Sequence, residues 1–345
     1  MPRCLPFLII AAAACAGIPA PQPAAKEVSL EIIATAVGDS VDGSQPFLVA
    51  PAPNRGFYLS AQALSGLVEQ LDSLGRFVRV IGRIGDGPGE MREPGGLIAE
   101  SGRLFITDRF GKWHTFDSTG RFLRDIPSTI SGVRNAILLR GDTLVVTQRI
   151  GDPTQQGKPL HLIAPDGRIV RSFGEAPASE APNHFASFFR ELARESDTSF
   201  WVARSDRYEI ELRSTSGALL RRFALQRVWF PPLDHDPESI DRERPATTIL
   251  AIHRDPHGHL LVIMRRARVD WKPNPAPDRK LMAPADGMKY ISETIEILDP
   301  GTGALLGSVE ERDFPIMGYL GDDRLIGIRE DALGRQVPVI VRLKH

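Results

Sequence analysis

An arginine recurs at the end of short apolar segments along this chain, and guanidinium groups are suited to binding anions. The five positions are Arg109, Arg149, Arg204, Arg265 and Arg329. Each guanidinium carries a permanent charge and a planar fork of donors that matches carboxylate and sulfate groups. Five converging side chains would form an electropositive ring for a carboxylate, a sulfate or a sugar acid. The alternative is that each arginine pairs with a nearby acid and braces a loop, because most surface charges are solvated or loosely paired.

Oxygen-bearing side chains offer a second kind of chemistry. Glu93, Asn135 and Asn183 each stand in a link just before an apolar segment. Carboxylate and amide oxygens of this kind hold hard cations such as calcium. Ordinary hydrogen bonding within the loops is the alternative interpretation.

The histidines and the candidate nucleophiles of the sequence do not indicate a particular reaction. His253, His257 and His259 gather around one turn, but zinc requires three or four convergent ligands held in place by their neighbours. We therefore interpret His257 as a solvated turn residue. The chain has no Gly-x-Ser-x-Gly nucleophile motif, and its two cysteines, Cys4 and Cys15, both precede the expected fold.

Two repeated phrases predict the elements that position these residues. The phrase LDSLGRF at residues 71–77 returns as FDSTGRF at 116–122, with weaker copies at 163–169, 213–219 and 298–304. A second phrase, clearest at 98–109, has copies at 138–149, 193–204, 252–265 and 320–329 and a degenerate copy at 49–61. Each phrase reads as a hairpin of two strands joined by a tight turn, and one pair of hairpins makes a propeller blade. The spacing of roughly 45 residues is that of a four-stranded blade, so the sequence predicts an all-β, six-bladed β-propeller.

The last blade is short of one strand, and the N-terminal region can supply it. After its inner hairpin only residues 337–343 remain as a strand, whereas residues 28–36 (VSLEIIATA) form an unassigned apolar segment near the other end. An unsealed ring would expose a sheet edge to other chains. We therefore expect the N-terminal strand to close the last blade.

The link from Gly82 to Leu97 carries a family resemblance. With LFITD at 104–108 and FDSTG at 116–120, it resembles the NHL-type repeat of six-bladed propellers. The resemblance implies the architecture, in a family that mixes extracellular binding proteins, ligand sensors and a few enzymes. The expected fold also resembles lactonases and related calcium hydrolases, which hold a divalent cation with Glu, Asn and Asp near the channel. That resemblance implies a calcium site at Glu93, Asn135 and Asn183.

The first residues are expected to be a targeting segment. Residues 1–16 read as a signal peptide, and Ala12-Ala13-Ala14-Cys15 resembles a bacterial lipoprotein box with Cys15 as the lipidated residue. Ordinary cleavage after Ala16 is the alternative. Residues 17–26 form a Pro-rich tether, and the propeller follows at 27–345. We expect an exported protein of the periplasm or cell surface, with outer-membrane anchoring if the lipid is present.

These features favour recognition over catalysis. The formal net charge of −1 argues against a nucleic-acid partner. The long links at 82–95, 174–190, 225–247 and 266–290 should lie on one face, where we expect a monomeric, non-enzymatic propeller to bind an unknown ligand or protein partner. No cofactor is predicted apart from calcium. The alternative function is a calcium-dependent hydrolase or lyase of the lactonase-like type.

Overall fold

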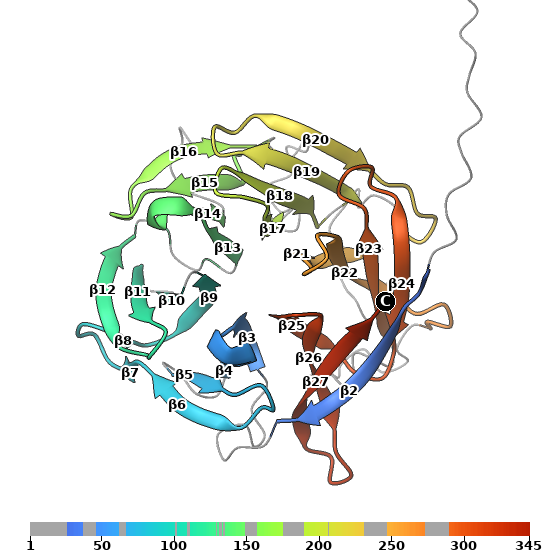
Figure 1. The fold of residues 1–345 in the computed structure, drawn as a ribbon, viewed down its shortest axis with the longest axis horizontal. Helices are drawn as coiled ribbons and strands as arrows, with labels where there is room; N and C mark the ends of the chain where they lie inside the picture. The colour runs from blue at the N-terminus through green and yellow to red at the C-terminus, as the bar shows by residue number, and fades with distance from the viewer. Residues whose placement is uncertain are drawn as a thin grey trace, which may run out of the picture.

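The protein is a six-bladed β-propeller, and Figure 1 shows its sheets arranged as a ring. The computed structural model describes residues 26–36, 46–61, 67–100, 102–108, 111–128, 130, 133, 135–148, 157–174, 190–205, 207–230, 247–272 and 290–345. Within these residues no helix is long and apolar enough to cross a membrane. The predicted fold class is confirmed.

Blades 1 to 3 follow one another along the chain, each with its first strand innermost. Blade 1 consists of β3 (Pro46–Pro51), β4 (Phe57–Ala61), β5 (Val68–Leu71) and β6 (Phe77–Ile81), with the 3₁₀ turn η1 (Pro53–Arg55) between β3 and β4. Blade 2 consists of β9 (Pro94–Glu100), β10 (Arg103–Asp108), β11 (Lys112–Asp117) and β12 (Phe122–Pro127). Blade 3 consists of β13 (Asn135–Leu138), β14 (Leu144–Thr147), β15 (Leu160–Ile163) and β16 (Ile169–Phe173), with the 3₁₀ turn η2 (Arg140–Asp142) between β13 and β14.

Blades 4 to 6 complete the ring. Blade 4 consists of β17 (Arg190–Arg194), β18 (Ser199–Arg204), β19 (Glu209–Ser214) and β20 (Leu219–Ala224). Blade 5 consists of β21 (Thr248–Arg254), β22 (Leu260–Ala267), β23 (Ile291–Leu298) and β24 (Leu305–Glu311). Blade 6 consists of β25 (Ile316–Gly321), β26 (Arg324–Glu330), β27 (Gln336–Lys344) and, as its outermost strand, β2 (Ser29–Thr35).

The first repeated phrase forms the turn of the outer hairpin in blades 1 to 5, and in blades 1 and 2 it reads Asp-x-x-Gly. In blade 2, Oδ1 of Asp117 accepts hydrogen bonds from the backbone N–H groups of Thr119 at 2.9 Å and Arg121 at 3.0 Å. Gly120 has a φ of 83°, in the left-handed region that glycine enters without strain. A Cβ on Gly120 would also lie only 2.5 Å from Cδ1 of Ile81, the last residue of blade 1. The glycine therefore permits both the tight turn and close packing against the preceding blade.

The N-terminal strand closes the ring, as predicted. β2 pairs antiparallel with β27 from Ser29 opposite Lys344 to Thr35 opposite Val339. A Cβ on Gly75, the outer-turn glycine of blade 1, would lie 2.7 Å from Ala36, which follows β2. The end of β2 thus contacts blade 1 just as the end of β6 contacts blade 2. Before β2, the two-residue strand β1 (Lys26–Glu27) pairs parallel with β24 of blade 5.

The core lies between the blades. Six clusters of buried apolar side chains each fill the space between two neighbouring sheets, as Trp201 of blade 4 and Ile252 of blade 5 do within one cluster. Alternate residues along each strand face opposite neighbours, so every blade is apolar on both sides. The ring is therefore a rigid frame that fixes its innermost strands around a common axis.

The link between blades 1 and 2 has a structure of its own. The short strands β7 (Arg83–Ile84) and β8 (Glu90–Met91) pair parallel within it. The Glu90 carboxylate accepts the backbone N–H of Gly87 at 2.9 Å. In a phosphate-binding loop, backbone N–H groups such as that of Gly87 donate to the ligand, whereas here this N–H donates to Glu90 of the same loop.

Candidate functional site

The axial channel holds a cavity of about 660 Å³. Its walls come from the first strands of all six blades, β3, β9, β13, β17, β21 and β25, which surround the middle of the ring in Figure 1. The lining residues lie mostly in the later part of each strand and include Ser196 and Asp197 in the turn after β17. The cavity therefore occupies the half of the channel nearer the short turns that join first and second strands. We call the side of these turns the short-turn face.

The mouth of this cavity carries paired charges from several blades. The Arg194 guanidinium at the end of β17 contacts the Glu100 carboxylate of blade 2, and it lies 2.5 Å from Oδ1 of Asp197. Arg254 of blade 5 lies 3.1 Å from Glu195 of blade 4. Each of these two arginines is thus paired with an acid, and the pairs join blade 4 to blade 2 and blade 5 to blade 4.

An aromatic pair lines the same cavity on the side of blades 5 and 6. The rings of His253 and Tyr319 stack with their centroids 4.8 Å apart and an interplanar angle of 25°. Burial lowers the pKa of His253 to about 4, and Nε2 of its ring is buried without a hydrogen-bond partner. Burial also raises the pKa of the Tyr319 hydroxyl. At neutral pH both rings are uncharged.

Asn135, one of the predicted cation ligands, lines the cavity from β13 and is joined there by an acid. Its Nδ2 donates to the Glu191 carboxylate of β17. Burial raises the pKa of Glu191 to about 8, and the hydrogen bond from Asn135 opposes this shift without cancelling it. Sequence reasoning missed Glu191, because an acid in a strand that reads RELAR gives no signal of burial. The side chains of Asn135 and Glu191 could supply oxygens to a hard cation.

The other two predicted cation ligands are Glu93 and Asn183. Glu93 is half-buried in the link just before β9. Asn183 lies outside the described residues. The predicted calcium site at Glu93, Asn135 and Asn183 therefore stays a prediction.

The structure places three of the five recurring arginines. Arg204 is buried at the end of β18, and Arg329 is exposed on β26. The guanidinium of Arg265 lies 2.7 Å from Oε1 of Glu293, which is fully buried. None of these three lines the axial cavity. Arg109 and Arg149 lie outside the described residues, so the anion-binding ring stays a prediction, while Arg265 follows the alternative of pairing with an acid.

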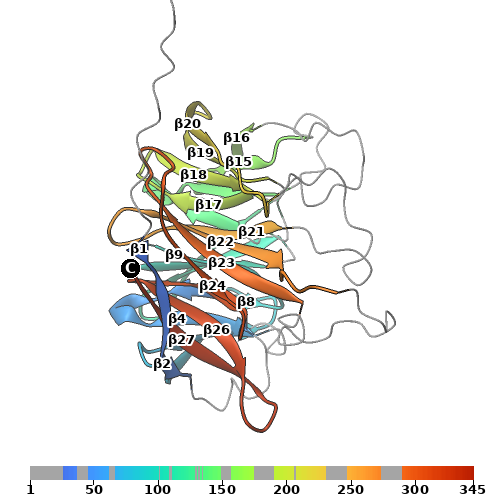
Figure 2. The ribbon, with the colours of Figure 1, turned by 90° about the vertical axis from the view of Figure 1, so that its right-hand side faces the viewer.

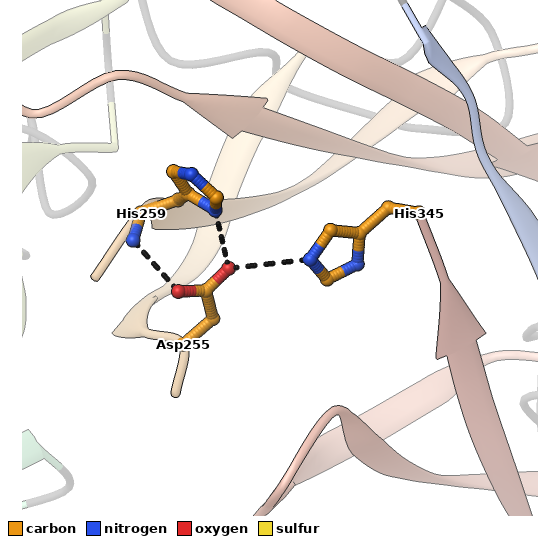
Figure 3. A group of neighbouring side chains, drawn as sticks. All are labelled: Asp255, His259 and His345. Atoms are coloured by element: carbon orange, nitrogen blue, oxygen red, sulfur yellow. Dashed lines mark hydrogen bonds and ion pairs between the residues drawn. The ribbon is translucent and has the colours of Figure 1, made fainter. Parts of the chain in front are cut away.

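A second polar cluster lies on the short-turn face between blades 5 and 6, and Figure 3 shows its three central residues. Nδ1 of His259 is 2.9 Å from Oδ2 of Asp255, and Nε2 of His345 is 3.6 Å from the same oxygen. Nearby, Nε2 of His257 is 3.5 Å from Oδ2 of Asp323. The expectation that His257 is a solvated turn residue agrees with its 58% exposed side chain, but it overlooked these partners. Asp323 and His345 are too distant in the sequence from the turn for spacing to reveal them.

Comparisons with known proteins define the fold and no more. No protein-family profile matches the chain, and no curated protein matches it. Among solved structures, the chain is similar to a Bacteroides fragilis protein thought to be exported, with 12% identity, a TM-score of 0.60 and coverage of 92% of this chain and 96% of the other. It is also similar to a member of the DUF4221 family from Bacteroides vulgatus, with 10% identity, a TM-score of 0.64 and coverage of 92% and 99%. At these identities the likeness establishes the six-bladed architecture, and function must be argued from the site.

Proposed function

We propose that this protein is an exported propeller that binds a small, partly apolar molecule in its axial channel and does not transform it. The observation that carries the proposal is the cavity of about 660 Å³ bounded by all six blades. Ligand sites typically occupy about 300–1,000 Å³ and combine apolar walls with a few fixed polar groups. Here Leu97, Ile137 and Met317 are among the apolar lining residues, and the polar groups gather at the mouth.

The charges at the mouth suit a neutral or zwitterionic ligand better than a strong anion. Arg194 is held by Glu100 and Asp197, and Arg254 by Glu195. An anion would have to displace one of these acids before it gained a guanidinium. A ligand with both donors and acceptors can bond to the outer edges of the pairs without breaking them.

The charged groups at the mouth and His253 are poorly suited to proton transfer, whereas Glu191, with its pKa raised to about 8, belongs to the second candidate function below. A general base works best when its pKa lies near the working pH. The pKa of His253 is lowered to about 4 by burial, so its ring is a weak base. The carboxylates at the mouth are engaged with arginines. These features favour recognition over catalysis.

Export and the face used for binding rest on separate grounds. The predicted signal peptide supports export, and the likeness to a propeller thought to be exported agrees with it. The predicted loop-rich face lies mostly outside the described residues, whereas the cavity is on the short-turn side. We therefore place the small-molecule site in the channel and leave the loop-rich face as the predicted surface for a protein partner.

Blocking the channel tests this function. We would compare the wild type with Ala251→Trp, which places a large ring in the cavity wall, and with Leu220→Trp, whose side chain is exposed on β20. Thermal shifts are measured against a panel of sugars, sugar acids, lactones, amino acids and short peptides. We expect a compound that stabilises the wild type and Leu220→Trp but not Ala251→Trp. Equal stabilisation of the Ala251→Trp variant would place the ligand elsewhere and contradict the proposal.

The Asn135–Glu191 pair favours calcium-dependent hydrolysis as a second candidate function. A partly buried acid without a cationic partner is a usual component of a hard-cation site. Calorimetric titration with calcium chloride, paired with a lactone-hydrolysis assay, separates the two functions. Calcium binding and hydrolysis that both disappear in Glu191→Gln would support the enzyme, and hydrolysis that survives in this variant would exclude a calcium site at Glu191.

A further inference from the structure

Three histidines and two aspartates meet on the short-turn face, away from the axial cavity. Asp255, His257 and His259 belong to the turn between β21 and β22 of blade 5. His345 follows β27 of blade 6, and Asp323 lies in the turn between β25 and β26 of the same blade. The cluster therefore exists only when blades 5 and 6 are assembled side by side.

The turn of blade 5 fixes the orientation of the Asp255 carboxylate. Its side chain is fully buried, and its Oδ1 accepts the backbone N–H of His259 at 2.7 Å. That bond leaves Oδ2 directed at the rings of His259 and His345, at 2.9 Å and 3.6 Å (Figure 3). The carboxylate and the two imidazoles thus converge on one point from two blades.

Several atoms of the cluster are buried without a hydrogen-bond partner. The side chain of His345 is only 10% exposed, and neither of its ring nitrogens makes a hydrogen bond. Oδ1 of Asp323 is likewise buried and unpaired. A buried polar atom without a partner costs about 1–3 kcal/mol, so each instance calls for an explanation. A bound ion between these groups would supply one.

We propose that Asp255, His259 and His345 bind a divalent transition metal such as zinc. One ligand atom from each of the three residues lies within 4.8 Å of the other two. In a tetrahedral zinc site with bonds of about 2.0–2.2 Å, ligand atoms are about 3.3–3.6 Å apart, so small ring rotations would complete the geometry. A second set, His257, Asp323 and His345, satisfies the same distance limit and shares His345 with the first. His257 or Asp323 could therefore serve as the fourth ligand.

The donor set determines which metals fit. Two imidazoles and a carboxylate suit zinc, copper, nickel and iron, whereas calcium and magnesium prefer oxygen ligands alone. The 58% exposed His257 side chain shows that solvent reaches the edge of the cluster, so an ion can enter without unfolding of the blade. This site is distinct from the oxygen site considered at Asn135 and Glu191.

The position of the cluster indicates a structural role for the ion. His345 directly follows Lys344, which pairs with Ser29 at the start of the N-terminal strand β2. A metal that joins His345 to the blade 5 turn would link blade 5 to the end of β27, the strand whose pairing with β2 closes the ring. Because the ligands converge only in the folded ring, the ion would bind the native state preferentially and stabilise it.

Zinc titration of the full chain, expressed without a histidine tag and stripped of metal with a chelator, tests the proposal. A chromophoric chelator serves as competitor, and unfolding is followed with and without zinc. We expect one zinc per chain and a higher melting temperature. His345→Gln and His259→Gln should each weaken zinc binding at least about 100-fold, because even residues that only support metal ligands change affinity by about 10–100-fold.

A buried histidine of another blade provides the control. Both ring nitrogens of His161 are engaged, with Ser172 at 2.7 Å and Gln148 at 2.9 Å. His161→Gln should therefore leave zinc affinity unchanged, and the melting temperature without zinc shows whether each variant is folded. Cobalt in place of zinc should give the visible absorption of a tetrahedral site. Absence of zinc binding by the wild type, or binding that persists in both His345→Gln and His259→Gln, would overturn the proposal.

Discussion

The Glu191 carboxyl makes the stability of this protein depend on pH across the neutral range. Burial raises its pKa from the ordinary value of 4.5 to about 8. Between these values the folded state holds a proton that the unfolded state has released. Stability is therefore fully present below pH 4.5 and falls as the pH rises to about 8.

The size of the effect follows from the pKa. Each pH unit within this window removes about 1.4 kcal/mol of unfolding free energy. Below pH 6.5 the half-buried His253, with its pKa lowered to about 4, adds a loss of stability as the pH falls, so the two groups oppose each other there. From pH 6.5 to 8 the Glu191 contribution remains, and it amounts to about 2 kcal/mol.

Chemical denaturation followed by tryptophan fluorescence at pH 6.5 and 8 measures this contribution. Glu191→Gln cannot ionise and can still accept the hydrogen bond from Asn135, so it should lose about 2 kcal/mol less than the wild type across the interval. Glu31→Gln is the control, because Lys344 lowers the pKa of the exposed Glu31 and keeps its titration outside this interval. A Glu191→Gln variant with the same pH dependence as the wild type would refute the reasoning.

Three further predictions address the ring, the arginines and the leader. Deletion of residues 1–36 should lower the melting temperature, because burial of Val28 alone contributes about 2 kcal/mol; an unchanged melting temperature would show that β2 does not seal the ring. Arg265→Ala should destabilise by about 1–3 kcal/mol in denaturation, since it leaves the buried Glu293 with the backbone N–H of Ile316 but without its cationic partner. A stability equal to that of the wild type would make this ion pair incidental. Cys15→Ser should move the protein from the membrane fraction to the soluble fraction, and equal membrane recovery would exclude a lipid there.

The repeated parts of the fold were predictable because their causes are local. An Asp whose carboxylate caps a turn and a Gly with positive φ must stand a few residues apart, so the phrase around Asp117 and Gly120 could be read directly. Ring closure was also predictable. The last blade lacks one strand and the apolar segment at 28–36 belongs to no other blade, so this segment can supply the missing strand and cover the open sheet edge. In both cases the residues that determine the structure lie close together in the sequence, in one hairpin or in one strand.

The candidate sites were less predictable because they form between blades. Glu100 and Arg194 meet across the channel, and Asp255 meets His345, although nearly a hundred residues separate the members of each pair. No spacing rule identifies such partners before the ring is assembled. The recurring arginines show the opposite problem: their sequence pattern is regular, but Arg265 is directed to a buried glutamate of its own blade.

The closure of the ring also determines how an anchored protein would be oriented. The described chain begins at β1, which pairs with Gly307 and Ser308 of β24, and β2 begins opposite Lys344. Figure 2 shows β1 and the C-terminal end together on one side of the ring, which is the short-turn face. A lipid on Cys15 would therefore hold the cavity mouth and the histidine cluster toward the membrane, within the reach of about 3.3 Å per intervening residue. The opposite face, where β16 and β22 end, would be directed away from the bilayer, where a protein partner could approach it.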